Sequence, residues 1–241
     1  MSEAILQETA VAPRGAATLM PIMGVVFAAF LVIGVAMPVL PLHVHDGLGL
    51  GTFMVGLVAG SQFAASLVSR PWAGHYSDSR GAKRGVTAGL LAAGAAGLLY
   101  FASLGFTGNP VTSIAILLLG RGLLGAAESF IITAAVSWGL ALVDPRSTGK
   151  VIAWVGSAMF AAFAIGAPAG SALYASYGFA AIAAATAVAP LLTLLLVAPL
   201  PTVAPVQHAR RELKCDFPRP QMALPRLIMK QTVRSSACHI K

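Results

Sequence analysis

The chain has 241 residues, enough for one or two soluble domains, but its composition excludes an ordinary soluble protein. It is 57% hydrophobic and only 10% charged, with a mean hydropathy of +0.82, whereas soluble domains carry about 25% charged residues. The net charge of +8 could indicate nucleic-acid binding, yet half of the sixteen basic residues lie after Pro201 and most of the others lie in two short loops. That placement favours a lipid bilayer over a nucleic acid as the partner.

Long stretches without charge predict the spans of a membrane protein. No Asp, Glu, Lys or Arg occurs within residues 15–45, 47–69, 85–120 and 151–209. A helix needs roughly 20 apolar residues to cross about 30 Å of hydrocarbon, and the alternating pattern of a membrane β-barrel is missing. The sequence therefore predicts an all-α membrane protein with six spans, at about 18–42, 52–75, 86–106, 112–142, 150–175 and 179–199.

The two ends of the chain are expected to lie outside the spans. The first apolar run is too long for the h-region of a cleaved signal peptide, so residues 1–17 are expected to precede a span that is retained. Basic residues occur only in alternate connections, which predicts that both termini are cytoplasmic. Residues 201–241 are basic and rich in proline, as expected for a disordered cytosolic tail, and Cys215 and Cys238 match no metal or redox spacing.

The connection after the second span has a distinctive order of residues: Gly74-His-Tyr-Ser-Asp78-Ser-Arg-Gly81-Ala-Lys83-Arg84. Gly74 is expected to allow close approach of another backbone, and Gly81 a tight turn with positive φ. Asp78 is expected to anchor an ion network with some of the basic groups nearby and in the loop before the fifth span, or to face a helix N-terminus. The alternative is a polar loop whose cations only set the topology.

The fourth span carries two ionisable residues, Arg121 and Glu128, with Gly125 between them. A separation of seven residues places both on one helix face, about 10.5 Å apart along the axis. Charged groups at this depth are costly and normally face a cavity or a partner. Together with Gln62 they are candidates for a substrate or proton pathway. The alternatives are that Arg121 bridges to backbone carbonyls, that Glu128 only compensates Arg121, and that Gln62 serves a helix contact.

Other features favour packing over chemistry. The fifth-span segment Gly166-Ala-Pro168-Ala-Gly170 indicates a close, kinked helix contact, and the pairs Gly56/Gly60 and Gly85/Gly89 are typical of packing faces. His43 and His45 could bind a metal, but a role at the end of the span fits them better. No protease, esterase or Walker-type motif is found, so neither an enzyme nor a cofactor or metal site is predicted.

The spacing of Gly74, Asp78, Gly81 and Lys83 resembles the signature loop of the major facilitator superfamily (MFS), and Arg121 with Gly125 resembles that family's fourth span. The loop departs from the pattern by placing a serine directly after the acid, where the family often has a basic residue. The fifth-span motif is similar to that of export-type members, whose adjacent Gly-Pro pair is interrupted here. The segments VHD, SRPWAGHYSDSRG and GRGLLGAAES also resemble the YhhS/YfcJ branch of bacterial inner-membrane permeases.

The resemblance covers about residues 18–200 and implies the N-terminal six-helix bundle of an MFS transporter, built as two inverted three-helix repeats. It implies secondary transport of a small solute by alternating access, coupled to protons and efflux-like, in the cell inner membrane. Family members have twelve spans with the substrate site between two halves, so a second six-helix bundle is an expected partner beside lipid, solute and protons. The alternative is a truncated, non-transporting remnant or a membrane interaction protein.

Overall fold

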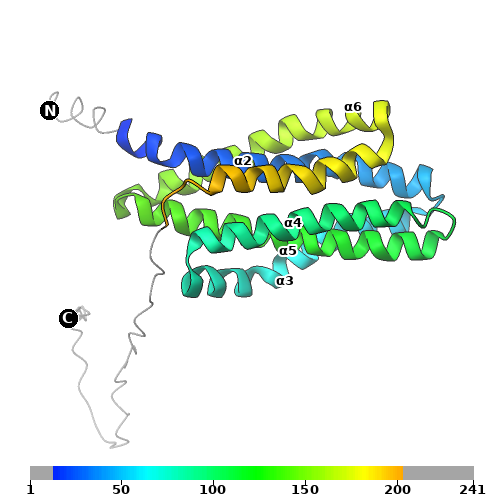
Figure 1. The fold of residues 1–241 in the computed structure, drawn as a ribbon, viewed down its shortest axis with the longest axis horizontal. Coiled ribbons are helices and arrows are strands. Elements are labelled where there is room, and N and C mark those ends of the chain that lie inside the picture. Colours follow the sequence, from blue (N-terminus) through cyan, green and yellow to red (C-terminus); the bar gives the residue numbers. More distant parts are fainter. Residues whose placement is uncertain (1–12, 203–241) are drawn as a thin grey trace, which may run out of the picture. The chain divides into compact units, whose positions relative to one another are not determined.

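A computed structural model describes residues 13–202, which form helices and short connections without any strand in that range (Figure 1). The predicted segment before residue 13, the tail from 203 onward, and both cysteines lie outside the described residues. The helices are α2 (Pro13–Leu42), α3 (Thr52–Arg80), α4 (Ala82–Leu104), α5 (Pro110–Leu142) and α6 (Thr148–Val197), with a π-helical turn η1 (His43–Gly47) and a 3₁₀ turn η2 (Pro145–Ser147).

The described chain has five helices long and apolar enough to cross a membrane, where the sequence predicts six spans. The difference lies in α6, which has 50 residues and would measure about 75 Å if it were straight, far more than the hydrocarbon thickness. Gly178 has non-helical backbone angles, φ 69° and ψ −168°, and the chain reverses its direction there (Figure 1). We therefore divide α6 into a first arm, 148–177, and a second arm, 179–197, at the predicted break between the fifth and sixth spans.

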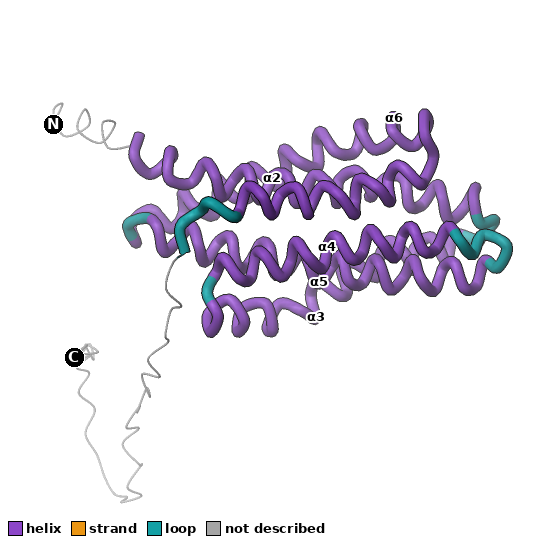
Figure 2. Tube along the Cα trace, viewed as in Figure 1, coloured by secondary structure: helices purple, strands orange, loops and turns teal. Residues whose placement is uncertain are grey.

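Connections gather at the two ends of the bundle, as the loop segments in Figure 2 show. We call the end with the α3–α4 and α5–α6 connections the basic end, because Arg80, Lys83, Arg84, Arg146 and Lys150 lie there. The helices at this end begin earlier or end later than predicted: α3 continues to residue 80, α4 begins at 82, and α2 begins at 13. Helical hydrogen bonds need no apolar side chains, so helices extend past the apolar stretch from which the spans were inferred.

Gly81 connects α3 to α4 without any intervening loop. Its φ is 93° and its N–H donates to the Ser77 carbonyl at 2.9 Å. This angle lies in the region that costs glycine little and other residues much more, so the predicted tight turn with positive φ is confirmed.

Glycines bring α2 and the first arm of α6 into backbone contact, which confirms the close helix contact predicted for the fifth-span motif. A Cβ atom at Gly166 would lie 2.9 Å from the Leu31 carbonyl oxygen, and one at Gly170 would overlap the Val35 backbone. On the α2 side, a Cβ at Gly34 would lie 3.1 Å from the Ala162 carbonyl oxygen. Pro168 is exposed and keeps helical backbone angles, so the reversal occurs at the later glycine and not at this proline.

Helix α3 is the least covered helix, and the close contacts predicted for its glycines are not formed among the described residues, so they stay predictions. Its buried side chains lie on one face, toward α5, and 17% of its apolar window is buried, against 50% for α4 and α5. No described atom lies within 4 Å of a Cβ built at Gly56, Gly60 or Gly74. The Gly85/Gly89 pair of α4 does pack closely, against Ala134 and Ile131 of α5, as its spacing predicted.

Replacing Gly170 by alanine should destabilise the bundle, because the new methyl group would meet the backbone of α2 with no flexible side chain to move aside. We expect a loss of about 1–3 kcal/mol, the usual cost of overpacking. The control is Gly156→Ala in the same arm, where the added Cβ meets nothing within 4 Å and the helix gains propensity. Thermal unfolding in detergent would compare the two variants. Equal melting temperatures would contradict a close backbone contact between Gly170 and α2.

Candidate functional site

The candidate site begins at the seam between α3 and α5, where Gln62 and Gly125 meet. A Cβ atom at Gly125 would overlap the backbone carbonyl of Gln62, so the absence of a side chain lets the two helices touch there. Gln62 is completely buried, and its Nε2 donates a 2.9 Å hydrogen bond to Oε2 of Glu128, one turn beyond Gly125. Gln62 therefore lies in a helix contact and holds the carboxylate at the same time.

A second pair of polar residues continues this seam. Ser129 donates a hydrogen bond from its hydroxyl to the backbone carbonyl of Ser66, and the two hydroxyl oxygens are 3.3 Å apart. Both side chains are buried. In lipid, apolar side chains give little energy to helix association, and hydrogen bonds between helices supply part of it instead. This seam therefore has two sources of association energy, the close packing of small residues and polar contacts.

Arg121 is 2% exposed and lies on the inner side of this seam. It interacts electrostatically with Tyr100 of α4 and with Glu128. Gly120 makes room for the aromatic ring, since a Cβ there would lie 2.9 Å from a ring carbon of Tyr100. Arg121 and Glu128 thus belong to one cluster in the interior of the described helices, as their spacing suggested.

The guanidinium of Arg121 keeps unused donors. Its Nε and Nη1 atoms and Oε1 of Gln62 are buried and have no hydrogen-bond partner among residues 13–202. The alternative that Arg121 bridges to backbone carbonyls finds no hydrogen bond to support it in the same range. Buried polar groups are normally satisfied, so these atoms mark a place where water or a solute would find several partners.

Glu128 interacts with a second cation besides Arg121. Arg70 of α3 is exposed and interacts electrostatically with the Glu128 carboxylate, which is itself only partly buried. The carboxylate therefore interacts with a buried and an exposed guanidinium and accepts a hydrogen bond from the Gln62 amide.

Lys83 and Asp144 bond to backbone groups and not to the expected ion network. Lys83 Nζ donates to the carbonyl oxygens of Ala198 and Leu200, and Asp144 accepts a 2.9 Å bond from the Arg146 backbone N–H. Among the described residues, no hydrogen bond or ion pair of the Asp78 carboxylate is formed, so a network around Asp78 stays a prediction.

The remaining cations and histidines lie nearer the helix ends. The Arg80 guanidinium lies 5.4 Å from the centre of the Tyr76 ring, and Arg84 is exposed. At the other end of the bundle, His43 stacks on Phe179 with ring centres 3.9 Å apart, and His45 lies within hydrogen-bond distance of the Leu50 carbonyl. These contacts place both histidines in packing at the end of the first span.

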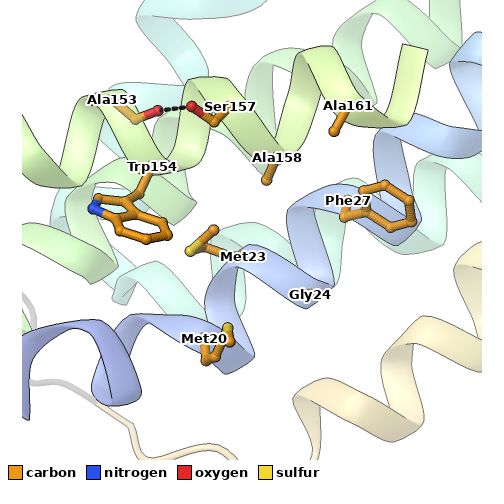
Figure 3. A pocket seen from close by; sticks show the side chains of 9 residues that line it. All are labelled: Met20, Met23, Gly24, Phe27, Ala153, Trp154, Ser157, Ala158 and Ala161. Atoms are coloured by element: carbon orange, nitrogen blue, oxygen red, sulfur yellow. Dashed lines mark hydrogen bonds between the residues drawn. The ribbon is translucent and has the colours of Figure 1, made fainter. Parts of the chain in front are cut away.

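A cavity of about 570 Å³ lies elsewhere, between α2 and the first arm of α6 (Figure 3). Its lining from α2 is Met20, Met23, Gly24 and Phe27, and its lining from α6 is Ala153, Trp154, Ser157, Ala158 and Ala161. The Ser157 hydroxyl is already bonded to the Ala153 carbonyl at 2.8 Å, so the walls are almost entirely apolar. None of the candidate residues lines this cavity.

Sequence reasoning missed this cavity, although part of its signal was present. Met20, Met23 and Phe27 recur at helical spacing, which identifies one face of a helix but not what that face meets. The cavity has the size of a ligand pocket and lacks ionisable groups, whereas the Gln62–Glu128–Arg121 cluster has the chemistry and no large cavity of its own. Of these two places, only the cluster contains residues that carry charge.

Comparison with known proteins identifies the family. The model of the Major Facilitator Superfamily matches residues 22–236. The chain belongs to this superfamily. The MFS-type transporter YhhS of Escherichia coli K12 is 42% identical over 178 residues, which are 73% of this chain and 44% of that protein.

Other bacterial relatives give the same assignment. An MFS-type transporter of Salmonella typhimurium is 38% identical over 193 residues, 80% of this chain and 50% of its own length. An MFS-type transporter of Pseudomonas aeruginosa is 44% identical over 139 residues, 58% of this chain and 35% of its own length. The chain thus spans half or less of the length of these relatives, and both the predicted family and the resemblance to YhhS are confirmed.

A double-mutant cycle would test whether Gln62 and Glu128 are energetically coupled. Gln62→Leu and Glu128→Leu should each change stability, and the double variant should differ from their sum by about 0.6 kcal/mol, the average coupling of hydrogen bonds between membrane helices, and by no more than about 1.7 kcal/mol. The control pairs Gln62→Leu with Ser113→Ala, whose hydroxyl bonds to the Ser103 carbonyl instead. Unfolding in mixed micelles supplies the energies; additive effects in the first cycle would contradict the contact.

Proposed function

We propose that this chain forms half of a secondary transporter that moves a small solute across the inner membrane by alternating access, coupled to protons and in the direction of export. The observation that carries the proposal is the Glu128 carboxylate, held by Gln62 and flanked by the buried Arg121, within helices of an MFS bundle. Ionisable groups at membrane depth are costly and usually functional. MFS membership supports solute transport as the general activity.

The geometry gives each residue of the cluster a role. Glu128 would take up and release the coupling proton, since it is the carboxylate of the cluster and is only partly buried. Gln62 would keep the carboxylate oriented in both protonation states, because an amide can donate to either form. Arg121 would attract the carboxylate electrostatically, and its Nε and Nη1 donors would be available to a solute or to water.

A second six-helix bundle is the partner that we propose for the open face of α3. Phe53 and Trp72 are 77% and 63% exposed there, and the glycines of this helix have no close neighbour. Small residues beside large apolar ones suit close helix packing in a membrane. The apolar cavity between α2 and α6 would add a surface for apolar parts of the solute.

The proposed orientation places both termini and the basic end in the cytoplasm. Single-cysteine variants Arg84→Cys and Thr107→Cys, made after replacing Cys215 and Cys238 by serine, report on positions that are both exposed and lie at opposite ends of the bundle. With a membrane-impermeant maleimide applied outside spheroplasts, we expect Thr107→Cys to react and Arg84→Cys to react only after lysis. Reaction of both from the same side would overturn the orientation.

Proton coupling can be measured in proteoliposomes that enclose the pH dye pyranine. Gradients of ethidium, benzoate and glucose would present a cation, an anion and a neutral solute. We expect at least one of them to drive a proton flux with the wild-type chain, and Glu128→Gln to abolish that flux because a carboxamide cannot titrate. The matched control is Ser69→Ala, a neighbouring polar residue whose hydroxyl bonds only within α3. Full flux in Glu128→Gln would exclude Glu128 as the coupling site, and absence of flux in the wild type would favour the non-transporting remnant.

A further inference from the structure

The strongest feature that the proposed function leaves unexplained is Lys83. Its ammonium donates hydrogen bonds of 2.8 Å to the Ala198 carbonyl and 2.7 Å to the Leu200 carbonyl. These acceptors lie more than a hundred residues further along the chain, at the end of the second arm of α6. Figure 1 shows the start of α4 and the end of α6 at the same end of the bundle.

Helix electrostatics explain what the cation does there. Lys83 is in the first turn of α4, where no acidic residue occurs and where a positive charge is unfavourable next to the positive end of the helix dipole. At the end of α6 a positive charge is favourable, because the last turn has no basic residue and the final carbonyls lack partners within the helix. The two helix ends meet side by side, so one ammonium lies near the positive pole of α4 and binds the negative pole of α6.

The two bonds of Lys83 hold both the C-cap of α6 and the residues that follow it. Ala198 is the C-cap of α6, whereas Leu200 lies beyond it, where the chain leaves the bundle. Leu200 and Pro201 also line a small cavity with Ile22 of α2 and Trp138 of α5. The departing chain is therefore held against α2 and α5 by packing and against α4 by a pair of charged hydrogen bonds.

We propose that Lys83 is a positioning residue that fixes the course of residues 198–202 after the end of α6. The turn at Gly81 determines where Lys83 lies, so a movement of the α3–α4 connection would be passed to the segment after residue 197. This assignment goes beyond the proposed transport function and does not depend on it, since it concerns a contact within the bundle that is present whether or not a solute moves.

Competitive acetylation of the full-length wild-type chain in detergent micelles tests the contact directly. N-hydroxysuccinimidyl acetate should modify Lys83 about tenfold more slowly than Lys150, because loss of even one charged hydrogen bond opposes the reaction by that order. Lys150 is exposed and lies at the same end of the bundle, which makes it the internal standard. Equal rates for the two lysines would overturn the proposal, and this readout requires no variant to fold.

Hydrogen exchange of residues 194–202 then tests whether the hydrogen bonds of Lys83 protect this segment, or whether any nearby positive charge does so. We expect faster exchange in Lys83→Met, exchange close to the wild type in Lys83→Arg, which keeps the donors, and unchanged exchange in Arg84→Met, which removes an exposed cation next to it. Equal exchange in Lys83→Met and Arg84→Met, or no rescue by arginine, would also overturn the proposal. None of these measurements uses transport, so a failure of the transport assay leaves this result independent.

Discussion

The bundle depends on direct contact between helix backbones. In lipid the apolar side chains of a helix gain little by meeting another helix, because the acyl chains are equally apolar, so association depends on close van der Waals contact and on hydrogen bonds between helices. This chain achieves both with glycine. Gly170 meets the backbone of Val35, Gly125 that of Gln62, and Gly97 that of Ala187. Each contact leaves no space for a methyl group, so the helices cannot separate or slide without losing it.

The polar cluster follows from one of these contacts. Because Gly125 allows α3 to approach α5, Gln62 is brought within hydrogen-bond distance of Glu128, 66 residues away in sequence. The same approach aligns Ser66 with Ser129 one turn further on. Packing and chemistry therefore share a single seam, and a larger residue at Gly125 would displace the carboxylate as well as the helix.

Charge placement in the sequence was enough to predict the helical class and the division of α6 near Gly178, because lipid excludes charge from the spans and turns require glycine. The family was predicted from the resemblance of the loop after α3 and of the Arg121/Gly125 pair to known motifs. Charge placement could not predict which glycines would touch a neighbour. Gly74 and Gly85 look alike in sequence, yet only Gly85 has a close neighbour in the described chain, since that depends on which face of each helix is covered. The partners of Lys83 were missed because backbone carbonyls carry no signal in the sequence, and the expectation for this loop considered side-chain charges and helix N-termini but not helix C-termini.

The arrangement of these contacts supports the expected inverted repeat. If helices α2, α3 and α4 correspond to α5 and the two arms of α6, then the connection at Gly81 corresponds to that at Gly178. Both are glycines with positive φ between consecutive helices, and they lie at opposite ends of the bundle (Figure 1), as inversion requires.

The seams correspond in the same way under this relation. The contact of α2 with the first arm of α6, made by Gly170, corresponds to the contact of α5 with α3, made by Gly125. The contact of α4 with the second arm of α6, made by Gly97 and Ala187, corresponds to itself and so lies where a two-fold axis in the membrane plane would pass. One seam of the related pair carries Gln62 and Glu128, whereas the other meets the lining of the apolar cavity at Ala158 and Ala161, close to Ala162. An inverted repeat of one packing motif therefore carries polar side chains in one copy and borders an apolar cavity in the other.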